Sequence, residues 1–122
     1  MLILMTFLGC AMGGVVRYLG MTLVSRVVGE RFPWGTLAVN ALGSLLLGFV
    51  LGGGLFASGG LQAFLGIGFC GGLTTFSTFS LQTLSLASEQ SWGKALVNIL
   101  GSVLICLLSL LSGYALGEVW AR

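Results

Sequence analysis

Gly66 to Ser80 reads G-I-G-F-C-G-G-L-T-T-F-S-T-F-S and lies within the longest stretch of the chain that has no charged residue. Its glycines weaken a helix, and the hydroxyl residues that follow them alternate with Phe76 and Phe79. Irregular backbone at membrane depth is tolerated only where it is buried in protein or lines a cavity. We therefore expect a break in a transmembrane helix here, and a functional site at the break.

The fold class is predicted from the uncharged stretches on either side. One runs from Arg31 to Glu89 and a second from Lys94 to Glu118. Because a bilayer core takes about 20 apolar residues per helical crossing, the first stretch holds two crossings and the second holds one. A fourth crossing fits before Arg26, where Arg17 is the only charge. We predict an all-α membrane protein whose single domain, residues 1–122, has transmembrane helices near residues 2–25, 35–56, 61–87 and 95–117, the third of them broken.

Composition agrees with this prediction. Charged residues make up 7% of the chain, whereas a soluble domain carries about 25%, and the mean hydropathy is +1.10. A cleaved signal peptide is the alternative for the N-terminus, but no basic residue precedes the apolar run. The expected connections are short and lie at Arg26–Pro33, around Gly52–Gly60 including Ser58, and at Ser88–Gly93.

The chain contains 21 glycines, and many of them fall inside the predicted helices. Several form small-xxx-small pairs, a spacing that lets helix backbones approach closely. These pairs are Gly9 with Gly13, Gly48 with Gly52, Gly68 with Gly72, and Gly113 with Gly117. Packing is the expected role of most of them, whereas Gly71 and Gly72 directly precede the hydroxyl cluster and are expected to belong to the site.

The residue types needed for enzyme chemistry or for a side-chain metal centre are missing. The chain has no histidine, and its cysteines, Cys10, Cys70 and Cys106, are odd in number and isolated within the predicted helices. We expect no disulfide framework, no zinc or haem site and, without a carboxylate in any span, no acid or base. The chain is not expected to be an enzyme.

Neutral polar residues recur at helical spacing instead. The positions that share a helix face are Thr36, Asn40 and Ser44 in the second span and Asn98, Ser102 and Cys106 in the fourth. Such stripes serve either as polar contacts between helices or as a polar path. Because cation and proton carriers usually need intramembrane carboxylates, such a path would suit an anion, which hydroxyl and amide donors can hold.

The motifs resemble those of the fluoride channel family (Fluc, also called CrcB). The hallmark G-G-x-T-T-F-S-T-F-S lies at Gly71–Ser80, with G-T-L-A-V-N-A-L-G-S-L-L-L-G at Gly35–Gly48. G-G-V-V-R-Y at Gly13–Tyr18 and V-N-I-L-G-S at Val97–Ser102 extend the similarity to all four spans.

The resemblance implies a subunit that pairs with an inverted copy, forming an antiparallel dimer that carries fluoride passively out of a microbial cell across its membrane. It also implies a structural sodium ion (Na⁺) at the centre of the dimer, held by the backbone carbonyls of Gly71 and Thr74. Four short helices do not enclose a hydrophilic path alone, and the glycine faces need partners. Both considerations favour the dimer.

The resemblance further assigns a fluoride pathway. The positions that match it are Phe76, Phe79, Asn40, Ser77, Thr75, Thr78, Asn98 and Ser102. Aromatic rings have electropositive edges, which would contact the anion, although two phenylalanines three residues apart on a helix are ordinarily core or lipid-facing side chains. Cys106 is a weak donor where relatives commonly have a hydroxyl.

Arg17 and Gln82 have separate interpretations. Near the end of the predicted first span, Arg17 is expected both to extend to the interface and to form an anion-concentrating vestibule. Gln82 stands where many relatives carry Glu, so it keeps hydrogen bonding without the charge. This difference removes a titratable group behind the pore and bears on the conduction rate, but it does not change the assignment to the family.

Two other classes of function were compared with the channel. A small multidrug exporter shares the length and the spans but needs a glutamate in its first membrane helix, which this chain lacks. A non-transporting membrane subunit would need only the packing glycines, and the polar stripes argue against it.

The orientation of the subunit is left open by the basic residues near the spans. Arg26, Arg31 and Lys94 lie on one face of the membrane and Arg122 on the other. Because basic residues concentrate in cytoplasmic loops, this bias leaves two possibilities. The chain forms an inverted homodimer, or it inserts one way and pairs with an oppositely oriented paralogue.

Overall fold

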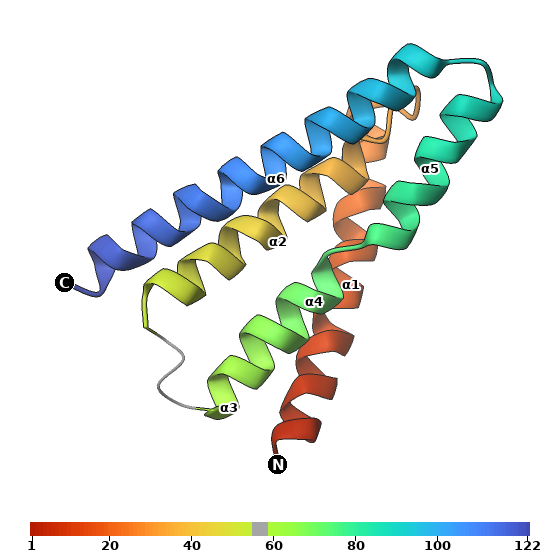
Figure 1. Ribbon diagram of the computed structural model, residues 1–122. Helices are drawn as coiled ribbons and strands as arrows, with labels where there is room; N and C mark the ends of the chain where they lie inside the picture. Colours follow the sequence, from red (N-terminus) through yellow and green to blue (C-terminus); the bar gives the residue numbers. More distant parts are fainter. Residues whose placement is uncertain (55–58) are drawn as a thin grey trace.

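The computed structural model describes residues 1–54 and 59–122, and its described regular structure is helical (Figure 1). The helices in chain order are α1 (Leu2–Val28), α2 (Trp34–Gly52), α3 (Gly59–Leu61), η2 (Gln62–Cys70), α4 (Gly71–Leu73), α5 (Phe76–Ser88) and α6 (Trp92–Trp120). Helices α3, η2 and α4 follow one another without interruption and form the first half of the third crossing, and α5 forms the second half. Element η2 is a π-helix, a form that is uncommon and often found near functional sites.

Within the described residues, four segments are long and apolar enough to cross a membrane: α1, α2, the segment Gly59–Ser88 and α6. This confirms the predicted all-α fold with four transmembrane helices and a broken third helix. The ends of the helices differ from the expected ones. Helix α1 continues to Val28, since Arg26 in its last turn suits the negative end of the helix dipole. Helix α2 ends at Gly52, whereas its expected last residues 55 and 56, and Ser58 of the expected turn, lie outside the described residues.

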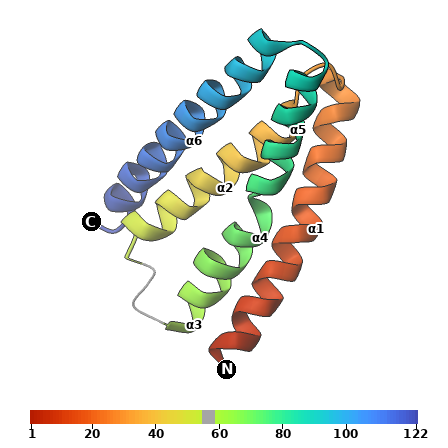
Figure 2. The same ribbon diagram turned by 45° about the vertical axis from the view of Figure 1, so that its right-hand side comes forward.

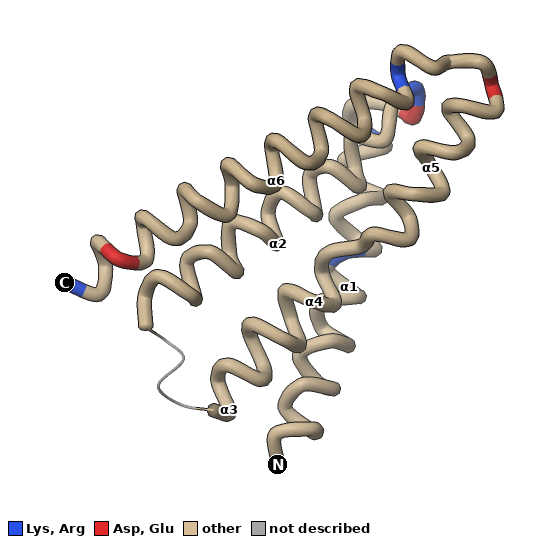
Figure 3. Tube along the Cα trace, viewed as in Figure 1, with Lys and Arg blue, Asp and Glu red and all other residues tan. Residues whose placement is uncertain are grey.

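The four crossings form two side-by-side pairs. Helix α1 packs along η2 and α4, and α2 packs along α6. Figure 2 shows the pairs converging near the α1–α2 and α5–α6 connections and diverging toward the two termini. Because alternate crossings run the same way through the membrane, the helices within each pair are parallel. Charged residues gather at the helix ends, apart from one basic position in the middle of α1, Arg17 (Figure 3).

Small-xxx-small pairs account for the close packing of the first helix pair. Gly9 and Gly13 of α1 face Gly68 of η2 and Gly72 of α4. A methyl group at any of these four positions would overlap the backbone of the facing helix. Glycine is therefore required here by backbone proximity.

The second helix pair has the same construction. Gly48 and Gly52 of α2 lie against the backbone of α6, and Gly113 and Gly117 of α6 lie against the backbone of α2. All four of the predicted glycine pairs are thus packed inside one chain. The expectation that these faces need a second copy is wrong, because helices two apart in the sequence already supply the partner for each of them.

Candidate functional site

The third crossing breaks at Thr74 and Thr75, directly after the glycines. Gly71 keeps a right-handed helical conformation (φ −64°, ψ −37°), whereas Thr74 (φ −81°, ψ 155°) and Thr75 (φ −148°, ψ 122°) are extended. As a result the N–H groups of Thr75 and Thr78 donate to side chains instead of to helical carbonyls, and the carbonyls of Gly71 and Thr74 lose their helical donors. The site is built from the groups that replace them.

The side-chain amide of Asn40 on α2 pairs with both backbone groups of Thr75. Its Nδ2 donates to the Thr75 carbonyl at 3.0 Å, and its Oδ1 accepts from the Thr75 N–H at 2.7 Å. In a continuous helix that N–H would donate to the Gly71 carbonyl. The side chain of Asn40 thus pairs the backbone of Thr75 and leaves the Gly71 carbonyl without its helical donor.

The predicted pore hydroxyls form the N-cap of α5. Thr75 Oγ1 accepts from the Thr78 N–H at 3.2 Å, donates to Thr78 Oγ1 at 3.0 Å and lies 3.3 Å from Ser77 Oγ. This is the usual role of threonine at a helix start. The structure therefore brings Thr75, Ser77 and Thr78 together, and their hydroxyls bond to one another.

The two phenylalanines lie one turn apart at the start of α5. Their ring centroids are 5.6 Å apart and the ring planes are tilted by 46°. Phe76 is 79% exposed, far above the exposure of a core residue, and Phe79 is partly exposed. Neither ring is packed into the interior of this chain as an ordinary packing phenylalanine would be.

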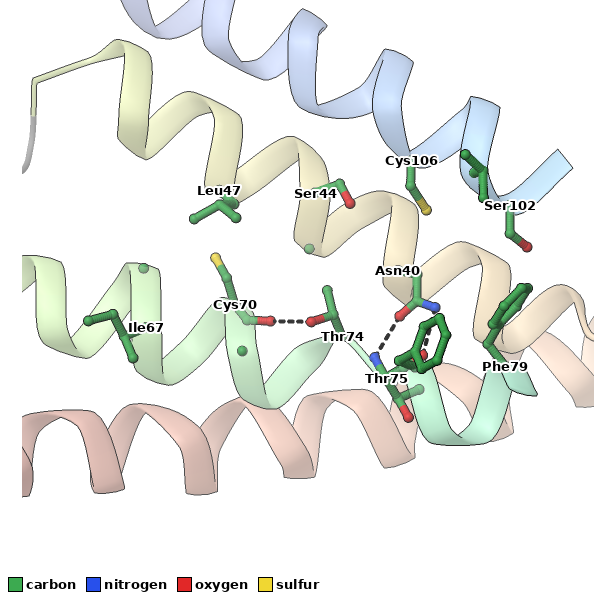
Figure 4. A pocket seen from close by; sticks show the side chains of 15 residues that line it. Asn40, Ser44, Leu47, Ile67, Cys70, Thr74, Thr75, Phe79, Ser102 and Cys106 are labelled. Atoms are coloured by element: carbon green, nitrogen blue, oxygen red, sulfur yellow. Dashed lines mark hydrogen bonds between the residues drawn. The ribbon is translucent and has the colours of Figure 1, made fainter. Parts of the chain in front are cut away.

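A groove of about 520 Å³ runs between the two helix pairs at the level of the break. The predicted pathway residues on its wall are Asn40, Thr75, Phe76, Phe79 and Ser102. Figure 4 shows the side chains of Asn40 and Ser102 and the ring of Phe79 directed to this space. Gly71, Thr74, Ser44 and Cys106 also line it, whereas Ser77, Thr78 and Asn98 do not.

Asn98 is buried behind the groove at the contact between α5 and α6. It is 2% exposed and its Nδ2 donates to Thr83 Oγ1 at 2.8 Å, while Ser102 Oγ donates to Asn98 Oδ1 at 3.4 Å. Thr83 in turn donates to the Phe79 carbonyl at 2.8 Å. Asn98 therefore links the two helices, and Ser102 continues this link into the groove.

Thr83 was not among the predicted site residues. The signal for it is its position four residues after Phe79, on the same face of α5. Periodicity alone did not distinguish it from the other hydroxyl residues of the helix.

Arg17 lies at the break, not at a membrane interface. Since α1 extends to Val28, Arg17 is about 16 Å from that end at the helical rise per residue. Its Nη1 donates to the Thr74 carbonyl at 3.1 Å. The expectation that Arg17 extends to the interface is wrong, because this carbonyl, left free by the break, is a nearer partner.

Two carbonyls at the break have the chemistry of ligands for a small cation. The Gly71 carbonyl has lost its helical donor to Asn40, and a methyl group at Gly71 would meet no atom within 4 Å. The Thr74 carbonyl bonds to Arg17 and has a second lone pair. Backbone carbonyls are hard oxygen ligands of the kind that small hard cations prefer. The residues present therefore fit such an ion.

The family model of the CrcB-like protein, Camphor Resistance (CrcB), matches residues 4–114. The chain belongs to the CrcB family. CrcB relatives include proteins named fluoride-specific ion channel FluC. The one from Shewanella frigidimarina is 45% identical over 93% of this chain and 94% of its own. The one from Hahella chejuensis is 49% identical over 89% and 88%, and the one from Magnetococcus marinus is 43% identical over 92% and 94%.

Membership of the CrcB family confirms the resemblance seen in the motifs. Its relatives carry the name of an ion channel rather than of an enzyme, in agreement with the expectation for this chain. Together with the four membrane-spanning segments, it identifies a multi-pass protein of the cell membrane.

Gln82 has a buried polar atom whose hydrogen bonding is incomplete in the described chain. Its Oε1 is buried and has no hydrogen-bond partner among the described residues, as is also true of Thr36 Oγ1. A buried amide oxygen without a donor is unfavourable by about 1–3 kcal/mol. Gln82 therefore has acceptor capacity that the isolated chain does not use.

Proposed function

We propose that this chain is one subunit of a fluoride-selective channel that lets fluoride leave the cytoplasm passively and so lowers its toxicity. The CrcB family match and the names of the relatives support the proposal. The observation that carries it is the groove at the helix break. There, amide and hydroxyl donors and exposed aromatic rings meet without a carboxylate among the described lining residues.

The groups on the groove wall are suited to an anion. Asn40 Nδ2 has two N–H groups and uses one of them on Thr75, so the other is available to a ligand. Ser102 contributes a hydroxyl held at 3.4 Å from Asn98 Oδ1, which is long enough to exchange for a better acceptor. Phe76 and Phe79 would turn their electropositive edges to the ion.

The remaining pathway residues would act in support. Thr75, Ser77 and Thr78 hold the start of α5, and Asn98 orients Ser102. The positive charge of Arg17 lies at the break, in a medium where charge acts over longer range than in water, and would raise the local concentration of anions as a vestibule does.

A second, inverted copy would complete the pathway. The groove is open on one side, and the exposed Phe76 and the open space at Gly71 are available to a partner. A two-fold axis in the membrane plane would bring the two broken helices together at mid-membrane, as in transporters with discontinuous helices. Gly71 and Thr74 of both copies would then hold Na⁺ as a structural ion. The ion supplies a fixed positive charge for the assembly.

The partner is either a second copy of this chain or an oppositely oriented paralogue. The basic residues at the α1–α2 and α5–α6 connections outnumber those at the C-terminus, which disfavours insertion in both directions. The homodimer remains the proposal, because a difference this small can be overridden.

Efflux from liposomes tests the function. Purified protein is reconstituted into vesicles loaded with fluoride or chloride, and efflux is followed with ion-selective electrodes against vesicles without protein. We expect rapid fluoride release, little chloride release and no effect of cationic drugs. Equal release of both anions would contradict selectivity. Proton-driven drug uptake would indicate the exporter class, and no flux at all would indicate a non-transporting subunit.

A further inference from the structure

Two consecutive carbonyls at the helix break accept hydrogen bonds from side chains of other helices. The Thr78 N–H, which a continuous helix would donate to Thr74, donates to Thr75 Oγ1 instead. The Thr74 carbonyl is bonded by Arg17 of α1, and the Thr75 carbonyl by Asn40 of α2. Two side chains from different helices thus hold the break from two directions.

The geometry points to Arg17 as the positioning residue of the site: its guanidinium fixes the Thr74 carbonyl, and through it the start of the helix that carries the two phenylalanines. This role differs from concentrating anions, for which the charge alone would suffice.

The partner of Arg17 is the first argument for positioning. A guanidinium within a membrane span is costly unless it is paired, and a carbonyl without a donor is costly there too. The chain's carboxylates, Glu30, Glu89 and Glu118, lie at or beyond helix ends. The contact between Arg17 and Thr74 relieves both costs at once.

The second argument is that the backbone of α1 is held in place next to Arg17. One turn before it, Gly13 lies so close to the third crossing that a methyl group there would overlap the Phe69 carbonyl of η2 and approach the Leu73 N–H of α4. The backbone of α1 is therefore fixed relative to the residue just before Thr74. A planar guanidinium on a fixed backbone sets the direction of its hydrogen bond more closely than a flexible ammonium would.

The short distance along the chain to the aromatic pair is the third argument. Phe76 begins α5 only two residues after Thr74, so a rotation of the Thr74 peptide moves the first turn of α5. That turn carries Phe76 and Phe79 and the cap made by Thr75. Arg17 acts on the pathway through the backbone without lining the groove itself.

Hydrogen exchange in bilayers tests the positioning role, whichever ion the chain conducts. The amides of Thr75 and Thr78 report on the break, because their acceptors are the side chains of Asn40 and Thr75. In Arg17→Met we expect the protection of both amides to fall by about tenfold or more, with amides in the middle of α6 unchanged. Unchanged protection at Thr75 and Thr78 would overturn the proposal.

Fluoride efflux separates positioning from charge, with Arg26→Met as the control that removes one charge from the same helix. We expect Arg17→Met to lose at least about nine-tenths of the flux, Arg17→Lys to recover part of it as a weaker donor, and Arg26→Met to stay near wild type. Loss of flux in Arg17→Met with normal amide protection would assign Arg17 to anion attraction and overturn positioning. If wild type itself carries no fluoride, the proposed function fails, whereas the exchange result still decides the role of Arg17.

A measurement on wild type covers the case in which Arg17→Met does not fold. Chains with ¹⁵N in the arginine guanidinium and ¹³C in the threonine carbonyls are examined by dipolar recoupling in bilayers. We expect a nitrogen–carbon coupling that disappears in Thr74→Ser, which keeps the backbone carbonyl but leaves it without the ¹³C label. No coupling in wild type, or one that survives in Thr74→Ser, would overturn the proposal.

Discussion

Asn40 has the most demanding position of any single residue at the break. Its amide pairs with both backbone groups of Thr75 and retains a second N–H group. An alanine at this position would leave a buried donor and a buried acceptor without partners, each worth about 1–3 kcal/mol.

We therefore expect Asn40→Ala to lower the free energy of unfolding by about 2–4 kcal/mol and to abolish fluoride flux. Thermal unfolding in detergent and efflux from liposomes would measure the two effects. Ser44→Ala is the matched control, because Ser44 lines the same groove one turn further along α2 but has no bond to the break. Equal stability of the two variants would contradict the role assigned to Asn40.

For Phe76 and Phe79, unlike Asn40, we expect substitution to reduce flux without lowering stability. Phe76→Ile and Phe79→Ile keep much of the volume and apolarity, and Phe76 is 79% exposed in the chain. We expect unfolding temperatures near that of wild type and fluoride efflux lower by about tenfold or more, since the electropositive ring edges are lost. Phe7→Ile on α1, where the ring is 67% exposed, should conduct normally. Normal efflux from both pathway variants would assign the rings to packing.

At the scale of the helices, Gly113 and Gly101 form a matched pair on α6. A methyl group at Gly113 would overlap the Leu45 carbonyl, whereas one at Gly101 would meet no atom within 4 Å. We expect Gly113→Ala to destabilise the chain by about 1–3 kcal/mol through overpacking. Gly101→Ala should be neutral or stabilising by up to about 1 kcal/mol, because alanine is the better helix former. Unfolding curves in detergent would compare them, and equal shifts would argue against the α2–α6 packing.

The helices themselves were predictable because the signals for them are local. Missing charge indicates a membrane span, and glycines followed by hydroxyl residues indicate a break. The break lies at Thr74 and Thr75 rather than at Gly71 because Asn40, which is distant in sequence, provides the hydrogen bonds that make an extended backbone stable there.

The partners of each helix were not predictable in the same way. A small-xxx-small spacing shows that a face can pack closely, but it does not identify the facing helix, so the intrachain partners of Gly48 and Gly113 were missed. Arg17 was misplaced for a related reason. Its partner, the Thr74 carbonyl, lies 57 residues further along the chain, so no signal near Arg17 in the sequence indicates the contact.

At the scale of the assembled molecule, the proposed sodium ion predicts that the dimer depends on the cation present. If Gly71 and Thr74 of two subunits hold Na⁺, replacing Na⁺ by a large organic cation during purification should weaken the dimer or its fluoride flux, because a cage of carbonyls fits a small ion. Size-exclusion chromatography and liposome efflux in the two salts would measure this, with K⁺ as the intermediate case. Identical behaviour in all three salts would contradict the cage.

Orientation is also a property of the whole assembly. Single cysteines at Ser91 and at Ala121, in a chain whose native cysteines are replaced, report opposite sides of the membrane. For the inverted homodimer we expect an impermeant thiol reagent on intact cells to reach both sites, each in part of the population. Labelling of the Ala121 position alone would show insertion in one direction and would exclude the homodimer.

The interleaved glycine packing has a consequence for how the chain is made. Synthesis delivers the helices to the membrane one after another, yet α1 packs against the third crossing and α2 packs against α6. The nascent chain therefore holds two helices in lipid with their glycine faces uncovered until the second half arrives. A ribosome that stops before Trp92 leaves α2 without its closest neighbour, so biogenesis is completed only when the last helix enters the bilayer.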